Sequence, residues 1–235
     1  MTPPSPPPDY FRIRQVAGLQ ELATTALADG VNALCWPRTL AGDFGEVVRL
    51  LGPGEGIVTI DDTRLLSLPV SAAGRAAVDV LLEDQRALRA LGLDPVLNCI
   101  HSDIRDDTDG PVPTDVYSFH ADSATVEADT WLCTYHGATS EGLRNEEAVR
   151  KVDVPAIRAE LLRLHGGADD DSFLEFLSEQ CYDLHYAPIP PAQPFSFGVG
   201  CLWRIALAHP GSLVPPCIHR APPTPPGQPR LLLIS

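Results

Sequence analysis

The sequence is poor in positive charge. Its 17 Lys and Arg residues stand against 31 Asp and Glu residues, giving a net charge of -14 at pH 7, and Lys151 is the only lysine. A surface with this balance repels nucleic-acid phosphates and anionic lipid headgroups. The composition therefore predicts no nucleic-acid partner and no membrane partner. It favours a small-molecule substrate, mildly one that carries an amine.

Long apolar runs and targeting signals are also missing. No apolar run approaches the roughly 20 residues that a membrane-spanning helix needs. Residues 1–9 form a proline tract without the basic and apolar regions of a signal peptide, and we expect a disordered arm there. We therefore expect a cytoplasmic protein. The remainder, 10–235, is long enough for a single domain with a sizeable core.

Paired cysteines and nucleotide-binding motifs are absent as well. The six cysteines are scattered without a CxxC pair, which argues against a cysteine-ligated zinc site, and we expect buried thiols. No GxGxxG motif, phosphate loop or internal repeat is present, which argues against dinucleotide and nucleoside-triphosphate folds. No serine has the context of a nucleophile elbow, so a hydrolase triad is disfavoured.

The chain does contain a helical N-terminal third followed by short β-prone runs. Apolar residues at helical spacing predict helices over 16–28, 44–51 and 71–91. Two further helical stretches, 154–165 and 170–184, predict an insertion over about 154–194 that borders the site. The predicted strands are rich in β-branched and aromatic residues, and they cover 31–36, 96–100, 116–120, 130–135, 195–205, 213–218 and 230–234. This order predicts an α+β domain built on a β-barrel or sandwich.

One short motif carries metal-binding chemistry. His120 and Asp122 follow a β-prone run, and residues i and i+2 of a strand point to the same face, so both side chains can bind one ion. A third ligand, His219, ends a later apolar run. Two histidines and one carboxylate form the facial triad of non-haem ferrous oxygenases. Because these ligands also bind Zn, Mn, Co and Ni, the sequence leaves the metal open.

Arginines close to the distal histidine are candidates for binding a carboxylate co-substrate. Arg230 lies eleven residues after His219 and opens the last β-prone run. A guanidinium can hold a carboxylate through two parallel hydrogen bonds. Arg220 is the alternative.

Three polar residues near the motif are further candidates. Tyr135 and Thr134 lie on the strand after the motif, where we expect them to face the interior, Tyr135 as a catalytic residue and Thr134 against the co-substrate. Glu141 is a candidate base, partner of a substrate amine or alternative ligand. The other histidines lack paired spacing, and we expect surface or hydrogen-bonded roles for them: His101, His136, His165, His185 and His209.

With its HxD motif, distal histidine and following arginine, the sequence resembles the iron(II)/2-oxoglutarate-dependent oxygenase superfamily. It is more closely similar to an uncharacterised bacterial family, the domain of unknown function number eighteen twenty-six. The similar blocks are 119–122, 132–135, 137, 139–141, 219–223 and 230–233. The superfamily resemblance implies a double-stranded β-helix (jelly roll, cupin-like), with Fe(II) on His120, Asp122 and His219, and 2-oxoglutarate on Arg230.

Three hypotheses follow. In the first, the chain is a 2-oxoglutarate-dependent oxygenase that uses dioxygen to hydroxylate, desaturate or cyclise a small molecule. In the second, the substrate itself chelates iron on the same triad and no 2-oxoglutarate is used. In the third, the chain is a non-enzymatic zinc-binding or metal-homeostasis protein whose fourth ligand is Glu141 or water. The sequence leaves the oligomeric state open, a homodimer included.

Overall fold

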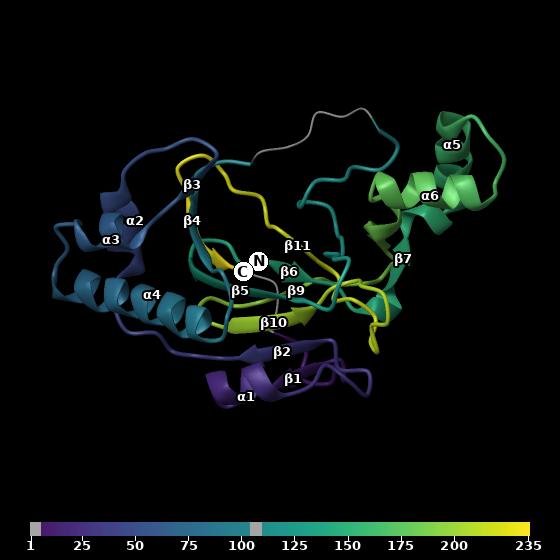
Figure 1. Ribbon diagram of the computed structural model, residues 1–235. Helices are drawn as coiled ribbons and strands as arrows, with labels where there is room; N and C mark the ends of the chain where they lie inside the picture. The colour runs from purple at the N-terminus through teal and green to yellow at the C-terminus, as the bar shows by residue number, and fades with distance from the viewer. Residues whose placement is uncertain (1–5, 104–109) are drawn as a thin grey trace.

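The computed structural model describes residues 6–103 and 110–235. The chain has a mixed α+β fold built around a seven-stranded sheet with the strand order β1-β2-β10-β5-β12-β4-β3 (Figure 1). Its neighbouring strands are antiparallel except for the parallel pair β1 and β2. The strands of this large sheet are β1 (Ile13–Gln15), β2 (Ala33–Trp36), β3 (Ile57–Thr59), β4 (Val96–Ile100), β5 (Asp129–His136), β10 (Leu202–Ala206) and β12 (Arg230–Ile234).

A second, smaller sheet has the order β11-β6-β9. Its strands are short: β6 (Glu141–Gly142), β9 (Phe195–Ser196) and β11 (His219–Arg220). Single bridges extend it, because His120 pairs with His219 on one side and with His185 on the other. A separate pair joins β7 (Ala148–Arg150) to β8 (Tyr186–Pro188). The described strands do not join into one closed sheet, so strand pairing alone does not establish a barrel.

Helices precede most of the large sheet in the chain, as the sequence predicts. They are α1 (Leu19–Thr24), α2 (Phe44–Leu51), α3 (Asp62–Leu66), α4 (Ala72–Ala90), α5 (Pro155–His165) and α6 (Asp171–Glu179). The carboxylate of Asp43 caps the start of α2 by accepting from the Glu46 amide, and Gly52, at φ 86°, ends it. Among the described residues, no helix combines the length and apolarity needed to cross a membrane.

The main hydrophobic core lies between the helices and one face of the large sheet. Alternate residues of β5 point to opposite faces, and Trp131, Cys133 and Tyr135 pack in this core with residues of α2 and α4. Leu132 points the other way, into a second apolar cluster that includes Phe195 of the small sheet. Apolar side chains from both sheets therefore line the space between them.

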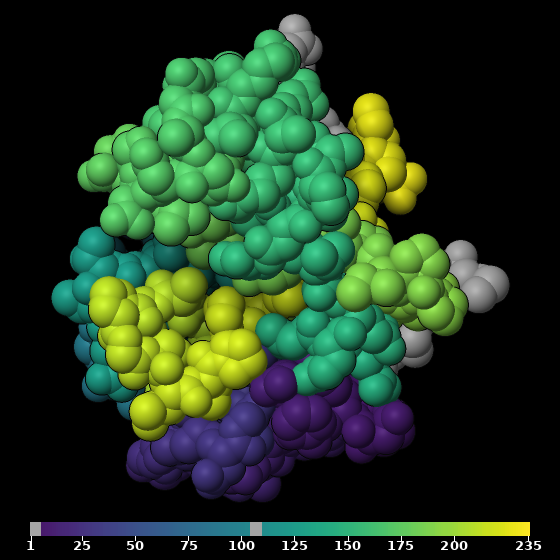
Figure 2. Space-filling view, turned by 90° about the vertical axis from the view of Figure 1, so that its right-hand side faces the viewer, coloured from purple at the N-terminus to yellow at the C-terminus, as the bar shows by residue number. Residues whose placement is uncertain are grey.

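The predicted helical insertion forms a lobe of its own. Figures 1 and 2 show α5 and α6, in green, projecting from the rest of the molecule. They share a small separate core that includes Leu161, Phe173 and Leu177. After α6 the chain returns to the small sheet, where the Ala121 amide donates to the carbonyl of Leu184 at 2.9 Å.

The predicted N-terminal arm is only partly described. Residues 1–5 of the arm lie outside the described part of the chain. Asp9, which the prediction also assigned to the arm, binds Arg144 at 2.8 Å. The next residue, Tyr10, is buried and donates a hydrogen bond to Asn145.

Candidate metal centre

The three predicted metal ligands come together. Ligand atoms of His120, Asp122 and His219 all lie within 4.8 Å of one another. The two histidines are direct cross-strand partners, because each backbone amide donates to the other's carbonyl at 2.9 Å. Their rings therefore lie side by side, with centroids 4.6 Å apart. Asp122, two residues after His120, presents its carboxylate to both rings, as the i, i+2 spacing predicts.

The distances within this cluster suit an ion between its members. Nε2 of His120 lies 3.5 Å from Oδ1 of Asp122, and Nε2 of His219 lies 3.7 Å from Oδ2 of the same carboxylate. These distances are long for hydrogen bonds. Donor atoms that each lie about 2.1 Å from one ion are roughly 3.0–3.4 Å apart, which is close to the observed spacing.

Hydrogen bonds on the far side of each ring orient the ligands. The Nδ1 atom of His120 lies 2.9 Å from the carbonyl oxygen of Ser118, and Nδ1 of His219 lies 3.3 Å from that of Cys217. A carbonyl accepts from a protonated Nδ1, which leaves the lone pair of Nε2 for a metal ion. Asp122 is oriented in the same way, because the Thr130 hydroxyl donates to its Oδ2 at 2.6 Å.

The cluster favours the protonation states that bind cations. Burial alone raises the pKa of Asp122, but contact with His120, the charge of His219 and the Thr130 hydroxyl outweigh burial and hold the pKa well below its usual range. Burial lowers the pKa of His219, although Asp122 opposes that shift. An ionised carboxylate and a neutral imidazole are the forms that ligate a divalent ion.

A cavity of about 210 Å³ joins this cluster to Arg230. Arg230 is 1% exposed, and its Nε donates to the carbonyl of Ala138 at 2.7 Å. Its Nη2 has no hydrogen-bond partner within the described part of the chain. Burial lowers the pKa of Arg230 to about 10, although Tyr117 and Asp103 oppose this. The guanidinium remains positively charged at neutral pH.

Apart from the three ligands and Arg230, the cavity is lined mostly by apolar side chains. They belong to the large sheet, to the segment before His120 and to the segment after β11. The remaining lining residues are Ile57, Asn98, Ile100, Val116, Tyr117, Leu132, Ser140, Ala221, Leu232 and Ile234.

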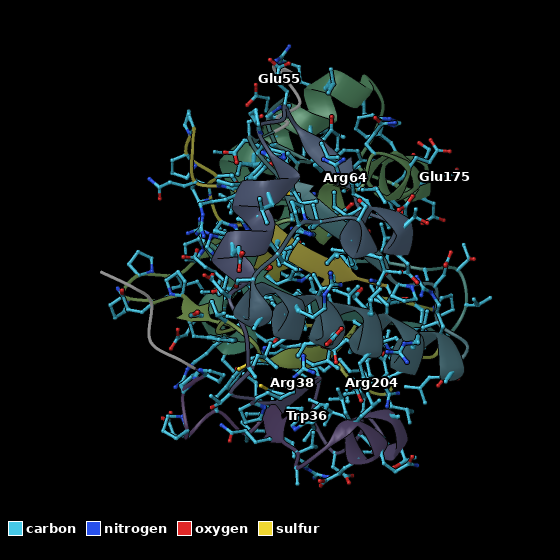
Figure 3. The ribbon with its side chains drawn as sticks, turned by 90° about the vertical axis from the view of Figure 1, so that its left-hand side faces the viewer. Trp36, Arg38, Glu55, Arg64, Glu175 and Arg204 are labelled. Carbon is cyan, nitrogen blue, oxygen red and sulfur yellow. The ribbon has the colours of Figure 1, made fainter. Side chains whose placement is uncertain are left out.

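Tyr135 lies on the opposite face of the large sheet, and its position does not support the predicted catalytic role. Its hydroxyl donates to Asp84 of α4 at 2.5 Å, and its ring stacks on Phe44 of α2. Asp84 also binds Arg38 at 2.7 Å. Figure 3 shows Arg38 beside Trp36, below α4. Tyr135 thus belongs to a buried polar network on the helix side of the sheet.

Arg220 and Glu141 bind each other instead of facing the cavity. They are opposite one another on β11 and β6, and Nη2 of Arg220 lies 2.6 Å from the Glu141 carboxylate. The Arg220 guanidinium also lies over the ring of Phe119, 4.4 Å from its centroid. This pairing satisfies both charges, so the geometry does not favour Arg220 as the co-substrate clamp or Glu141 as a ligand.

Thr134 is buried, but it does not line the cavity. Its backbone carbonyl accepts a hydrogen bond from the Gly200 amide at 2.8 Å, which ties β5 to the segment before β10. Its position therefore gives no support to contact with a co-substrate.

The helical lobe also differs from expectation. No residue of 154–194 lines the cavity, so α5 and α6 do not border the site. The insertion contributes His185 instead, whose ring centroid lies 5.8 Å from that of His120. The His185 Nδ1 is 2.7 Å from the Ser118 hydroxyl, and the Ser118 carbonyl binds His120. Burial, together with the nearby His120, lowers the pKa of His185 to about 4.

His185 and Thr130 are the functional candidates that sequence reasoning missed. Thr130 lies eight residues beyond its partner Asp122, and His185 lies more than sixty residues beyond His120. Neither spacing matches a local periodicity. Only the return of the chain beside residues 119–121 brings His185 to the site.

Comparisons with known protein families, with curated proteins and with solved structures find no match. The class of site is therefore defined by its own geometry. It is a buried group of two histidines and one carboxylate that could hold a metal ion, beside a buried arginine. Membership of the families named above stays a prediction.

Proposed function

We propose that the chain is a non-haem Fe(II) oxygenase that uses 2-oxoglutarate and dioxygen to oxidise a small molecule. One observation carries this proposal: a single cavity contains both the candidate metal ligands and a buried arginine whose Nη2 has no hydrogen-bond partner among the described residues. The ligands account for the metal, and the arginine accounts for an anionic co-substrate beside it.

The burial of Arg230 is the stronger part of this argument. A buried guanidinium is costly unless it is paired and hydrogen-bonded. One carbonyl, that of Ala138, satisfies Nε, whereas Nη2 finds no hydrogen-bond partner in residues 6–103 and 110–235. A carboxylate entering the cavity would supply charge and hydrogen bonds together. 2-Oxoglutarate has one carboxylate for Arg230 and, at its other end, a keto acid that can chelate a metal.

The order of the strands supports a jelly roll. The strands can be numbered from β4 as strand 1, with the segment around His120 as strand 2 and β5, β6, β9, β10, β11 and β12 as strands 3 to 8. In this numbering, which leaves out β1–β3 and the separate pair of β7 and β8, neighbouring strands have the order 1-8-3-6 in the large sheet and 2-7-4-5 in the small one. Two facing antiparallel sheets that exchange strands along the chain are the arrangement of a double-stranded β-helix. In this arrangement His120 and His219 lie on the small sheet, and Arg230 lies opposite them on the large sheet.

The residues divide the work as follows. Fe(II), when bound, supplies the dioxygen chemistry that no protein side chain performs. His120, Asp122 and His219 would hold it, with the Thr130 hydroxyl orienting Asp122. Arg230 would orient the co-substrate, and the apolar lining would keep water away from the reacting atoms.

The two alternative hypotheses draw less support from the structure. If the substrate alone chelates iron and no 2-oxoglutarate binds, the hypothesis names no anionic partner for the buried Arg230. For the zinc hypothesis the predicted fourth ligand is Glu141 or water. Glu141 is paired with Arg220, and a site completed by water gives no role to the buried Arg230.

The first test concerns the metal. We expect His120→Ala, Asp122→Ala and His219→Ala each to abolish stoichiometric Fe(II) binding, because two ligands form an incomplete chelate. Anaerobic equilibrium dialysis with metal analysis measures this, and circular dichroism checks that each variant is folded. His136→Ala, a histidine outside the cavity, is the control and should bind normally. Full iron occupancy in the His219 variant would remove that residue from the triad.

The second test concerns the co-substrate. Arg230→Met should spare iron but weaken 2-oxoglutarate binding, because a charge-assisted bidentate contact of about 2–4 kcal/mol corresponds to roughly 30- to 1000-fold in affinity. Arg230→Lys should rescue binding only in part, since lysine lacks the planar fork. The charge-transfer absorption that forms when 2-oxoglutarate chelates Fe(II) anaerobically reports binding.

Arg220→Met is the matched control for this second test. It makes the same substitution on β11 of the small sheet, outside the cavity, and should leave the titration unchanged. If the wild-type protein binds iron but shows no absorption change with 2-oxoglutarate, the co-substrate assignment is wrong.

A further inference from the structure

The cavity has very little charge to offer a substrate. Its described lining contains one carboxylate, that of Asp122, and one guanidinium, that of Arg230. The nearby Glu141 does not line it and is neutralised by Arg220. Asn98, Tyr117 and Ser140 supply the remaining polar groups, and these are uncharged at neutral pH.

The charges of Asp122 and Arg230 are balanced by those of the metal ion and 2-oxoglutarate in the proposed function. A divalent ion and Arg230 together carry three positive charges, and Asp122 and the two carboxylates of 2-oxoglutarate carry three negative ones. The loaded cavity is therefore neutral. A substrate ammonium or carboxylate entering it would find no free charged partner in the described lining, and burying an unpaired charge is unfavourable.

Two exposed apolar side chains mark where the cavity meets solvent. Ile57 and Val116 line the cavity, yet they are 51% and 52% exposed. Ile57 belongs to β3, the edge strand of the large sheet, and is held opposite Ile100. Val116 is fixed by its carbonyl, which accepts from the Ala221 amide at 2.7 Å. A fixed apolar rim favours an apolar group at the entrance.

The size of the cavity adds a limit. Its volume of about 210 Å³ lies below the roughly 300–1,000 Å³ of sites that enclose drug-sized ligands. With 2-oxoglutarate bound at Arg230, only a small part of a substrate can enter.

We infer that the part of the substrate that enters this site is small, uncharged and aliphatic, and that it passes between Ile57 and Val116. This inference rests on the proposed function and deepens it. It replaces the expectation of an amine, which the acidic composition favoured, because among the described acidic residues only Asp122 lines the cavity.

The test compares two probes of equal length, 1-pentanol and n-pentylamine, on the full chain loaded with Co(II) and 2-oxoglutarate. Paramagnetic Co(II) speeds the relaxation of probe protons only when the probe binds close to the ion, and the Zn(II)-loaded protein gives the diamagnetic blank. We expect 1-pentanol to show enhanced methyl relaxation at neutral pH. Pentylammonium should bind at least about tenfold more weakly, since 1.4 kcal/mol of charge burial suffices for that factor.

Substitutions at the rim test the route. Ile57→Asp and Val116→Asp should each weaken 1-pentanol binding and strengthen pentylammonium binding, because each places a carboxylate at the entrance. Both positions are exposed, so the fold should tolerate the change. Val58→Asp is the matched control, since Val58 is the next residue of β3, is 38% exposed and does not line the cavity. It should leave the preference of the wild type unchanged.

The outcomes separate this inference from the proposed function. Equal or tighter binding of pentylammonium in the wild type would overturn the inference while leaving the oxygenase proposal intact. Relaxation of neither probe, or no effect of the rim substitutions, would also overturn it. Failure of the protein to bind Co(II) or 2-oxoglutarate at all would contradict the proposed function, and the inference would fall with it.

Discussion

The role of a single residue on the large sheet depends on which face of the sheet its side chain occupies. On β5, Leu132 lines the cavity, whereas its neighbour Cys133 faces the helices. The sequence predicted that polar residues of this strand would serve the site. Tyr135, however, lies two residues after Cys133 and points to the same face of the sheet, so its side chain packs against the helices.

The network around Tyr135 gives a prediction about stability. Tyr135→Phe removes a hydrogen bond to the Asp84 carboxylate and should lower the free energy of unfolding by about 1.5–3 kcal/mol, while Fe(II) and 2-oxoglutarate affinities stay as in the wild type. Asp84→Ala should cost more, about 3–5 kcal/mol, because Arg38 is left buried without its partner. Urea denaturation measures the stability changes. A large loss of co-substrate affinity in Tyr135→Phe would restore its predicted catalytic role.

The candidate ligands were predictable for a local reason. The i, i+2 spacing of His120 and Asp122 fixes their common face once the backbone is extended. Recognising His219 required the order of motifs along the chain, not spacing alone. Thr130 and His185 were not predictable, because their positions depend on contacts between segments that no local pattern links.

Among the elements, those with strong patterns were predicted well. The predicted runs 96–100 and 230–234 are β4 and β12 with the same bounds. The run 195–205 is instead divided into β9 and β10, in different sheets, with Gly198 and Gly200 at positive φ between them. A continuous β-prone composition does not reveal that a chain crosses from one sheet to the other.

The predicted strands 116–120 and 213–218 were wrong for related reasons. The carboxylate of Asp115 accepts from the amides of Tyr117 and Ser118, which forms a turn in place of a strand. The second run contains Pro215 and Pro216, which lack amide donors, and the strand begins only at His219.

The helical lobe should behave as an element with its own stability. Its small core is separate from the main one, and Phe173 is fully buried within it. Phe173→Ala should cost about 3–5 kcal/mol locally. The amides of α5 and α6 should then lose protection from hydrogen exchange while those of β5 and β12 keep theirs.

Leu164→Ala provides the comparison for the lobe. Leu164 lies on α5 but is 54% exposed, so its removal should leave exchange nearly unchanged. An equal loss of protection in β12 and in α6 for Phe173→Ala would mean that the lobe and the sheets unfold as one unit.

At the scale of the whole molecule, the net charge of the chain differs from the charge of the groups that line the cavity. The net charge of -14 describes the outer surface. The described lining of the cavity contains one carboxylate and one guanidinium. The overall composition averages over residues that do not line the cavity, so the charge of the chain and the charge of the cavity are separate guides to what the protein binds.

The place of β12 has a consequence for how the protein is made. It follows all the other described strands in the sequence, yet it lies inside the large sheet, between β5 and β4, and it opens with Arg230. While the ribosome is still synthesising the preceding residues, β4 and β5 lack the strand that joins them. The nascent chain therefore exposes two unpaired strand edges, a known route to aggregation, until translation has delivered β12. The cavity, which Arg230, Leu232 and Ile234 of β12 help to line, can therefore form only after β12 has been synthesised.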